Sequence, residues 1–257
     1  MTAPLPGFAP DWPAPPNVRA WVTERGNAAR YGALNLAMHV GDEASAVAAN
    51  RLRLRAGLDL PVEPYWLQQV HGTRVIDLDR DDVRRADAAV TTRVGKVCTV
   101  MTADCLPVLF CDHAGTSDGV AHAGWRGLLD GVLSAAVAAL RVQPADLIAW
   151  LGPAISQAAY EVGAEVHDAF VARSPAAARR FMPNPRGRWQ ADLYALARDA
   201  LTAAGVQAVH GGGFCTFTEA ERFFSHRREA PCGRMAALIW LDAAFASPQA
   251  GCFPQGR

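Results

Sequence analysis

The segment VMTADCLPVLFCDHAGTSDGVAHAGWRG, from Val100 to Gly127, joins β-rich runs through turns that carry reactive side chains. The runs KVCTVMT and LPVLFCD are rich in β-branched and other apolar residues and are interrupted at the sequence ADC. Pro107 is the second residue after this interruption, and proline is rare inside a central strand. DGVAHA predicts a further short strand, which carries His122 close to its end. The segment therefore predicts a sheet with Cys105 and His122 at the ends of strands.

Strands and helices are interspersed along the rest of the chain. Further strands are predicted at RAWVTER, YWLQQV, RVIDLD, ADLIAWLG, VQAVHGGG and GRMAALIWLD, and helices at Glu43–Leu58, Trp125–Val142, Tyr160–Arg173 and Gln190–Gly205. The order lacks a regular βαβ rhythm. It favours an α+β fold, a single layered domain with mixed β-sheets covered by helices, over a doubly wound parallel sheet.

Composition limits the class of protein. The chain has 257 residues, 51% of them hydrophobic and 19% charged, which is ordinary for a globular protein. A formal net charge of zero gives no electrostatic reason to expect nucleic acid or an acidic membrane surface as a partner. No apolar run approaches the roughly 18 residues of a membrane span.

The two ends of the chain differ from its middle. Residues 1–16 are rich in proline and are interpreted as an extended arm, residues 17–245 as one catalytic domain, and residues 246–257 as a tail. The start lacks the basic region and apolar stretch of a secretory signal. We therefore expect a cytoplasmic protein whose six cysteines are free thiols.

Three potential metal ligands follow predicted strands. His71 lies in the turn HGT, and Cys105 and His122 follow it by 34 and a further 17 residues, so only folding could bring the three together. Loops at strand ends are where a rigid sheet presents functional groups. Catalytic zinc takes three protein ligands and lowers the pKa of a bound water to about 7. Copper could replace zinc, because it binds such ligands more tightly.

The residues alone leave other interpretations open. Cys105 and His122 could be core residues, or a cysteine nucleophile with its base that needs no metal. Such a cysteine hydrolase would act on an amide, for example a peptidoglycan precursor. A binding or regulatory protein without turnover also fits the pattern.

Six segments in one order carry a family resemblance. They are QQVHGTRV, ADAAVTT, TADCLPVLFCD, AHAGWRG, LGPAISQAAYEVG and FFSHRREAPCGRMAALIWL, which together span most of the chain. This pattern closely resembles the YfiH-type family, known as polyphenol oxidase or laccase-domain proteins and as purine nucleoside phosphorylases. The sequence departs from that pattern at Ala158-Ala159, where relatives often carry cysteine, and at His226, where tyrosine is common.

The resemblance implies a fold and a chemistry. It implies a compact domain related to cysteine-hydrolase-like toxin domains, in which His71, Cys105 and His122 bind one zinc ion. It also implies phosphorolysis of adenosine, inosine, guanosine and methylthioadenosine, and hydrolytic deamination of adenosine. Nucleosides and phosphate are then the expected partners, without nucleic acid or membrane, and the chain is expected to be a monomer or weak homodimer.

Further residues are assigned to the two reactions. Asp104 is the carboxylate nearest to Cys105 in sequence and is the candidate for proton transfer during deamination. Arg126 opens a predicted helix, whose first N–H groups attract anions, and is the first candidate for binding phosphate. Arg227 is the second such candidate, and Asn35 is a further candidate for substrate binding.

The alternative name of the family implies copper-dependent oxidation of polyphenols. A multicopper oxidase needs many imidazoles, commonly in H-x-H pairs, and a blue-copper site besides. This chain has seven histidines and no H-x-H sequence. The histidine content therefore disfavours four-copper chemistry.

Overall fold

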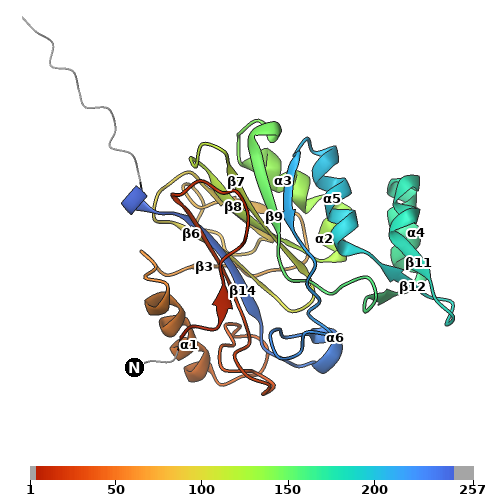
Figure 1. The fold of residues 1–257 in the computed structure, drawn as a ribbon, viewed down its shortest axis with the longest axis horizontal. Coiled ribbons are helices and arrows are strands. Elements are labelled where there is room, and N and C mark those ends of the chain that lie inside the picture. The colour runs from red at the N-terminus through yellow and green to blue at the C-terminus, as the bar shows by residue number, and fades with distance from the viewer. Residues whose placement is uncertain (1–3, 246–257) are drawn as a thin grey trace, which may run out of the picture.

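Two β-sheets pack face to face in the computed structural model, which describes residues 4–245 (Figure 1). One sheet has six strands in the order β13-β9-β7-β8-β5-β4, and the other has five in the order β1-β2-β14-β6-β3. A small third sheet, β10-β12-β11, lies with α4 in a lobe at the right of Figure 1.

The strands are β1 Gly7–Phe8, β2 Val18–Thr23, β3 Tyr65–Trp66, β4 Val75–Asp77, β5 Ala88–Thr91, β6 Val97–Thr102, β7 Leu106–Asp112, β8 Asp118–Ala123, β9 Leu147–Leu151, β10 Glu161–Val162, β11 Phe181–Pro183, β12 Trp189–Ala191, β13 Ala208–Gly211 and β14 Met235–Leu241. The α-helices are α1 Ala44–Gly57, α2 Trp125–Asp130, α3 Val132–Ala139, α4 Ala164–Arg173, α5 Leu193–Ala203 and α6 His226–Glu229. Short 3-10 helices span Pro144–Asp146, Pro175–Arg180 and Ala243–Phe245.

Apolar side chains fill the space between the two large sheets. The central strands β6, β7 and β8 are buried along their whole length, so they read as continuous apolar runs instead of alternating ones. Val100, Leu109, Val120 and Ile239 belong to the cluster that these sheets share, and each is inaccessible to solvent. Burying such a side chain stabilises a fold by about 1.5–3 kcal/mol.

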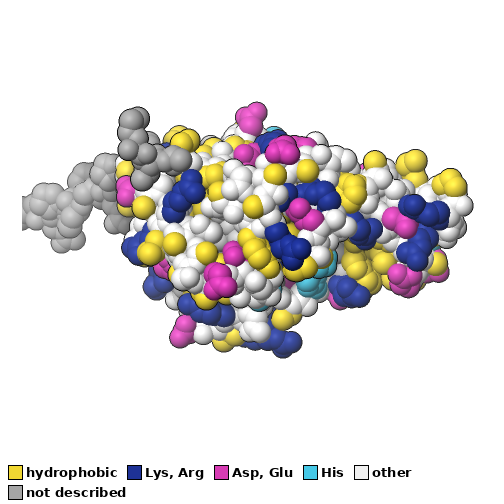
Figure 2. Space-filling view, turned by 90° about the horizontal axis from the view of Figure 1, so that it is seen from below, with side chains coloured by type: hydrophobic (Ala, Val, Ile, Leu, Met, Phe, Trp, Pro, Cys, Tyr) yellow, Lys and Arg dark blue, Asp and Glu magenta, His cyan; other side chains and the backbone are white. Residues whose placement is uncertain are grey.

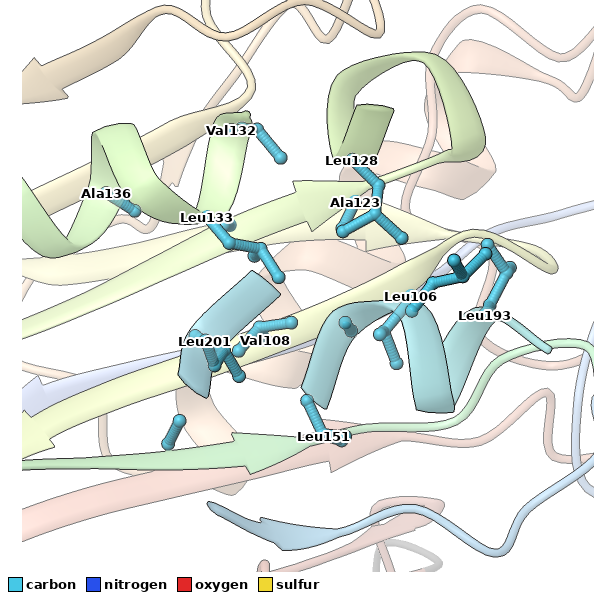
Figure 3. Packing of buried hydrophobic residues seen from close by; sticks show 14 of the residues in the cluster. Leu106, Val108, Ala123, Leu128, Val132, Leu133, Ala136, Leu151, Leu193 and Leu201 are labelled. Atoms are coloured by element: carbon cyan, nitrogen blue, oxygen red, sulfur yellow. The ribbon is translucent and has the colours of Figure 1, made fainter. Parts of the chain in front are cut away.

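Helices cover the outer faces of both sheets. Figure 3 shows Leu128, Leu133 and Leu201, from α2, α3 and α5, packed over Val108 and Leu151 of the six-stranded sheet. On the other side, α1 packs Leu54 into a separate cluster with residues of the five-stranded sheet. The predicted α+β class, with mixed sheets covered by helices, is confirmed. Among residues 4–245 no helix has the length and apolarity needed to cross a membrane.

Several predicted boundaries are wrong. The helix expected at Trp125–Val142 is two helices, because Gly131 between them has φ +100° in the left-handed region. The helix expected from Tyr160 begins only at Ala164, after β10. The helix expected from Gln190 begins after β12, where the carboxylate of Asp192 accepts a hydrogen bond from the N–H of Ala195.

The N-terminal segment adds a short strand to the fold. The expected arm at residues 1–16 contains β1, which pairs antiparallel with β2 and so extends the five-stranded sheet. The tail predicted at residues 246–257 lies outside the described residues. Five cysteines lie within the described part of the chain, and all five are free thiols, as expected.

Candidate metal centre

The strand pairing of the six-stranded sheet brings the three predicted ligands to the same end of its strands. Cys105 immediately precedes β7, and His122 is the penultimate residue of the antiparallel neighbour β8, opposite Pro107. His71 precedes β4, whose first residue pairs with the first residue of β5 beside β8. Because β6 belongs to the other sheet, the turn at residues 103–105 crosses between the sheets. The three side chains therefore converge although they are far apart in sequence.

The distances among these side chains fit one metal ion. Their ligand atoms all lie within 4.8 Å of one another, and Sγ of Cys105 is 3.7 Å from Nε2 of His71. Zinc bonds of about 2.0–2.3 Å at tetrahedral angles place ligand atoms roughly 3.3–3.8 Å apart. A thiol and two imidazoles are also the donor types that zinc prefers. The residues present therefore fit a zinc ion, with one coordination position left for a substrate or water.

Asp87 holds two of the three ligands in place. It is fully buried, and Oδ1 lies 2.8 Å from Nδ1 of His122. The same carboxylate accepts hydrogen bonds from the backbone N–H groups of Val70, His71 and Gly72. These bonds stabilise the left-handed backbone of His71, whose φ is +61°. Burial opposes ionisation of Asp87, but the hydrogen bonds from His122 and the backbone outweigh it and lower its pKa.

Sequence reasoning did not identify Asp87. It lies in the segment ADAAVTT, which contributed to the family resemblance but received no functional role. Asp87 directly precedes a strand whose four residues are all buried, which suggests that its carboxylate is buried too. A buried carboxylate requires partners, so this position could have indicated a functional role.

Without a metal ion, Cys105 and His122 favour the ionised pair. Burial disfavours the thiolate, but the positive charge of His122 and hydrogen bonds from both histidines lower the pKa of Cys105 to about 6. Burial also opposes protonation of His122, yet Cys105 and Asp87 raise its pKa to about 9. The centre therefore presents a thiolate at neutral pH, the form that binds metals.

Gly124 provides the space in which this centre forms. A Cβ atom at this position would lie 2.8 Å from Cδ2 of His71 and 3.0 Å from Sγ of Cys105. The φ of Gly124 is −70°, so its backbone suits any residue. Glycine is therefore needed here to leave room for the side chains of His71 and Cys105, and not for its backbone conformation.

The centre opens into a cavity of about 560 Å³. Such volumes are typical of sites for small molecules. Basic, amide and apolar side chains line it, namely His39, Leu67, Gln68, Gln69, His71, Met101, Thr102, Ala103, Asp104, Cys105, His122, Ile155, Tyr160, His226, Arg227 and Arg234. Figure 2 shows histidine side chains at the surface between the main body and the lobe, with basic side chains nearby.

Asp104 lines this cavity, but its carboxylate already has two partners. Oδ1 accepts a hydrogen bond from the hydroxyl of Thr216 at 2.6 Å, and Oδ2 accepts one from the backbone N–H of Arg227 at 2.7 Å. Its φ of +93° belongs to the sharp turn before Cys105. Asp104 therefore connects the turn between the sheets to the C-terminal segment, and its role in proton transfer stays a prediction.

Two other predicted substrate-binding residues do not line the cavity. Arg126 is exposed, with its guanidinium 4.3 Å from the centre of the Trp125 ring, and α2 has only six residues. Asn35 is fully buried, and its side chain bonds to Ala37, Asp42 and the backbone of Arg234. Arg227 does line the cavity.

Relatives named for an enzymatic activity match nearly the whole chain. The chain is 54% identical over 240 residues to a purine nucleoside phosphorylase of Pseudomonas aeruginosa. The alignment covers 91% of this chain and 98% of the relative. It is 47% identical over 239 residues to the purine nucleoside phosphorylase YfiH of Escherichia coli, with the same coverage.

Solved structures show the same fold. A Neisseria meningitidis protein of the DUF152 family aligns with a TM-score of 0.88 and 48% identity, covering 92% of this chain and 99% of that one. YlmD from Geobacillus stearothermophilus aligns with a TM-score of 0.85 and 27% identity, covering 94% and 98%. A family model described as multi-copper polyphenol oxidoreductase laccase matches residues 19–242. The chain therefore belongs to this laccase-like family, the YfiH or DUF152 family.

Proposed function

We propose that this chain is a zinc-dependent purine nucleoside enzyme. It phosphorolyses adenosine, inosine, guanosine and methylthioadenosine, and it deaminates adenosine by hydrolysis. The observation that carries the proposal is the convergence of His71, Cys105 and His122 at the end of a cavity large enough for a small molecule. The names of the relatives at 54% and 47% identity support the substrate class.

The two reactions share one centre but need different co-substrates. In phosphorolysis an oxygen of phosphate forms a bond to C1′ of the ribose, the bond from C1′ to the base breaks, and the base nitrogen takes a proton. In deamination water adds at C6 of adenine, and ammonia leaves to give inosine. A bound zinc ion would act as a Lewis acid toward the oxygen of phosphate or water.

The residues around the centre have separable tasks. His71, Cys105 and His122 would hold the metal, while Asp87 keeps His122 oriented through Nδ1 and leaves Nε2 for the ion. Apolar lining residues such as Leu67, Met101 and Ile155 offer surfaces against which a purine can pack. Asp87, which is fully buried and does not line the cavity, contributes orientation instead of substrate contact.

The test uses the full-length, zinc-loaded protein and chromatography of adenosine incubations. We expect adenine and ribose 1-phosphate when phosphate is present, and inosine when it is absent. Cys105→Ala should lose the metal and both activities while it retains its far-UV circular dichroism. No product from adenosine, inosine or guanosine at one zinc per chain would reject the proposal.

One observation favours a second candidate, a metal-independent cysteine hydrolase acting on an amide. Cys105, with its pKa lowered to about 6, His122 and Asp87 form the nucleophile, base and orienting acid that this chemistry needs. Its activity would survive complete chelation of metal and disappear on alkylation of Cys105. The zinc-dependent reactions should instead disappear on chelation and return with added zinc.

Copper oxidation of polyphenols has weaker support from the site. Within residues 4–245, the group His71, Cys105 and His122 is the one cluster of three potential ligands that are close enough to hold an ion. We expect copper to occupy this centre as a substitute for zinc when it is supplied.

A further inference from the structure

Two arginines on the cavity wall have no acidic partner. Arg227 and Arg234 both line the cavity that contains the metal centre, and neither forms a salt bridge within residues 4–245. By contrast, the neighbouring Arg228 bonds to Glu229 and to three backbone carbonyls. Arg228 is thus a structural residue, and the two lining arginines differ from it.

The lining arginines keep unused donors. Only Nη1 of Arg227 is engaged, with the carbonyl of Glu161 at 2.8 Å. Nη1 of Arg234 contacts the carbonyls of Cys232 and Gly233, at 2.7 and 3.0 Å. Nε and Nη2 of both side chains have no hydrogen-bond partner in the described part of the chain, although the guanidinium of Arg227 also lies 5.5 Å from the centre of the Tyr160 ring. Arg227 is exposed, and the half-buried Arg234 has no unpaired atom that is fully buried. Each guanidinium therefore offers an accessible pair of N–H groups with the geometry that phosphate oxygens accept.

The backbones of these arginines are held by two residues that the sequence had placed at the site. Asp104 accepts the N–H of Arg227 through Oδ2 at 2.7 Å. Asn35 accepts the N–H of Arg234 through Oδ1 at 3.0 Å. Asp104 belongs to the turn that carries Cys105, so Arg227 is tied directly to the metal centre. Such support reduces the conformational freedom lost when a ligand binds.

The charge of the cavity favours an anion. Asp104 is the one carboxylate that lines it, and both of its oxygens are engaged. The other ionisable lining residues outside the metal centre are Arg227, Arg234, His39, His226 and Tyr160. Two permanent positive charges therefore face the cavity against the single negative charge of Asp104, whose two oxygens are held by neutral donors and form no ion pair with either arginine.

We propose that Arg227 and Arg234 form a phosphate subsite beside the metal centre. The subsite holds the phosphate dianion that attacks C1′, so this inference rests on the proposed phosphorolysis. Asp104 and Asn35 act as positioning residues for the pair. Arg126, outside the cavity, has no part in it.

The first test compares the two reactions of the zinc-loaded protein. Arg227→Gln and Arg234→Gln should each raise the KM for phosphate about 10- to 100-fold, the loss expected for hydrogen bonds to a charged group. Deamination of adenosine without phosphate should change less than about twofold. Arg55→Gln on the exposed face of α1 is the matched control. Equal losses in both reactions, or an unchanged KM for phosphate, would overturn the subsite.

The second test does not depend on turnover. Calorimetry of inorganic phosphate with the zinc-loaded protein should show binding that weakens by the same factor in both variants at equal zinc content. This decides the subsite even if no nucleoside reacts and the proposed function fails. Absence of phosphate binding in the parent protein would overturn it. Adenosine 5′-monophosphate is the comparison ligand, and if it binds far more tightly through the same arginines, the assignment to free phosphate is wrong.

Asn35→Ala provides the readout for a positioning role. It should raise the KM for phosphate with little change in the kcat of deamination, because among the residues to which its side chain bonds only Arg234 lines the cavity. If Asn35→Ala instead lowered the kcat of both reactions, Asn35 would have only a structural role, and its role in positioning Arg234 would be wrong.

Discussion

Asp87 lies with Oδ1 2.8 Å from Nδ1 of His122, and both residues are buried. The ring of His122 thereby has one nitrogen engaged and one directed to the centre that it shares with His71 and Cys105. A carboxylate behind a metal-binding histidine orients the ring and raises its basicity.

Asp87→Asn should therefore weaken zinc binding about 10- to 100-fold. The amide has only one oxygen to accept the hydrogen bonds that both oxygens of Asp87 now accept. Competition with a chromophoric chelator measures the change. Asp79→Asn is the control and should keep the parental zinc affinity, because Asp79 follows β4 and bonds to Thr91 and Thr92 at the opposite end of the strands.

Gly124→Ala should lower zinc content and both nucleoside activities without preventing folding. The new methyl group would lie 2.8 Å from the ring of His71 and 3.0 Å from Sγ of Cys105, closer than carbon and sulfur atoms pack. Gly72→Ala, whose Cβ would meet no atom closer than 3.6 Å, should retain metal. Elemental analysis of both purified variants tests the pair, and full zinc in Gly124→Ala would contradict the steric account.

Alkylation of the metal-free protein should show the ionisation of Cys105. Its pKa of about 6 places half-maximal reaction with iodoacetamide near pH 6, since thiolate forms above that pH. His122→Ala should move this midpoint upward, toward the ordinary value of about 8.5. Burial raises the pKa of Cys98 and Cys111, so these thiols should stay unmodified in the folded protein. Mass spectrometry across a pH series identifies the labelled residue, and added zinc should protect it.

Asp118→Asn should stabilise the protein increasingly as pH rises. Asp118 is fully buried between the sheets, and burial raises its pKa well above the usual range. The unfolded chain releases this proton near pH 4, whereas the folded chain retains it, so stability is lost as pH rises above about 4. We expect a gain of about 1–3 kcal/mol at pH 8 and little change at pH 4. Thermal unfolding at both pH values measures it, with about 2–4 °C of Tm for each kcal/mol. An equal effect at the two pH values would rule out ionisation as the cause.

The sequence predicted the elements that local pattern determines. The runs around Cys105 and His122 are continuously apolar because β7 and β8 are buried on both faces, and such runs are visible without a structure. The break at Gly131 and the late start of α4 were missed, because helical composition continues across both boundaries. Helix propensity predicts a boundary poorly where a single glycine or a two-residue strand determines where the helix begins.

The sequence indicated the candidate metal ligands, but it did not indicate the residues that hold them in place. His71, Cys105 and His122 are residue types that bind zinc, and their positions after predicted strands together with the family resemblance singled them out. Asp87 and Arg234 gain their roles from partners 35 and 199 residues away, His122 and Asn35. No local pattern contains such separations. Asp104 and Asn35 were predicted at the site for catalysis and substrate binding; in the structure each accepts a hydrogen bond from the backbone of an arginine that lines the cavity.

The pairing of Pro107 with His122 has a consequence for folding quality. Because side chains alternate between the faces of a strand, a slip of one residue between β7 and β8 would turn the imidazole of His122 away from Cys105 and Asp87. A misregistered molecule could then keep its secondary structure and yet lack the centre. Under the proposed zinc binding, the zinc content of a preparation would follow the fraction of molecules whose strands are in register, which circular dichroism cannot distinguish.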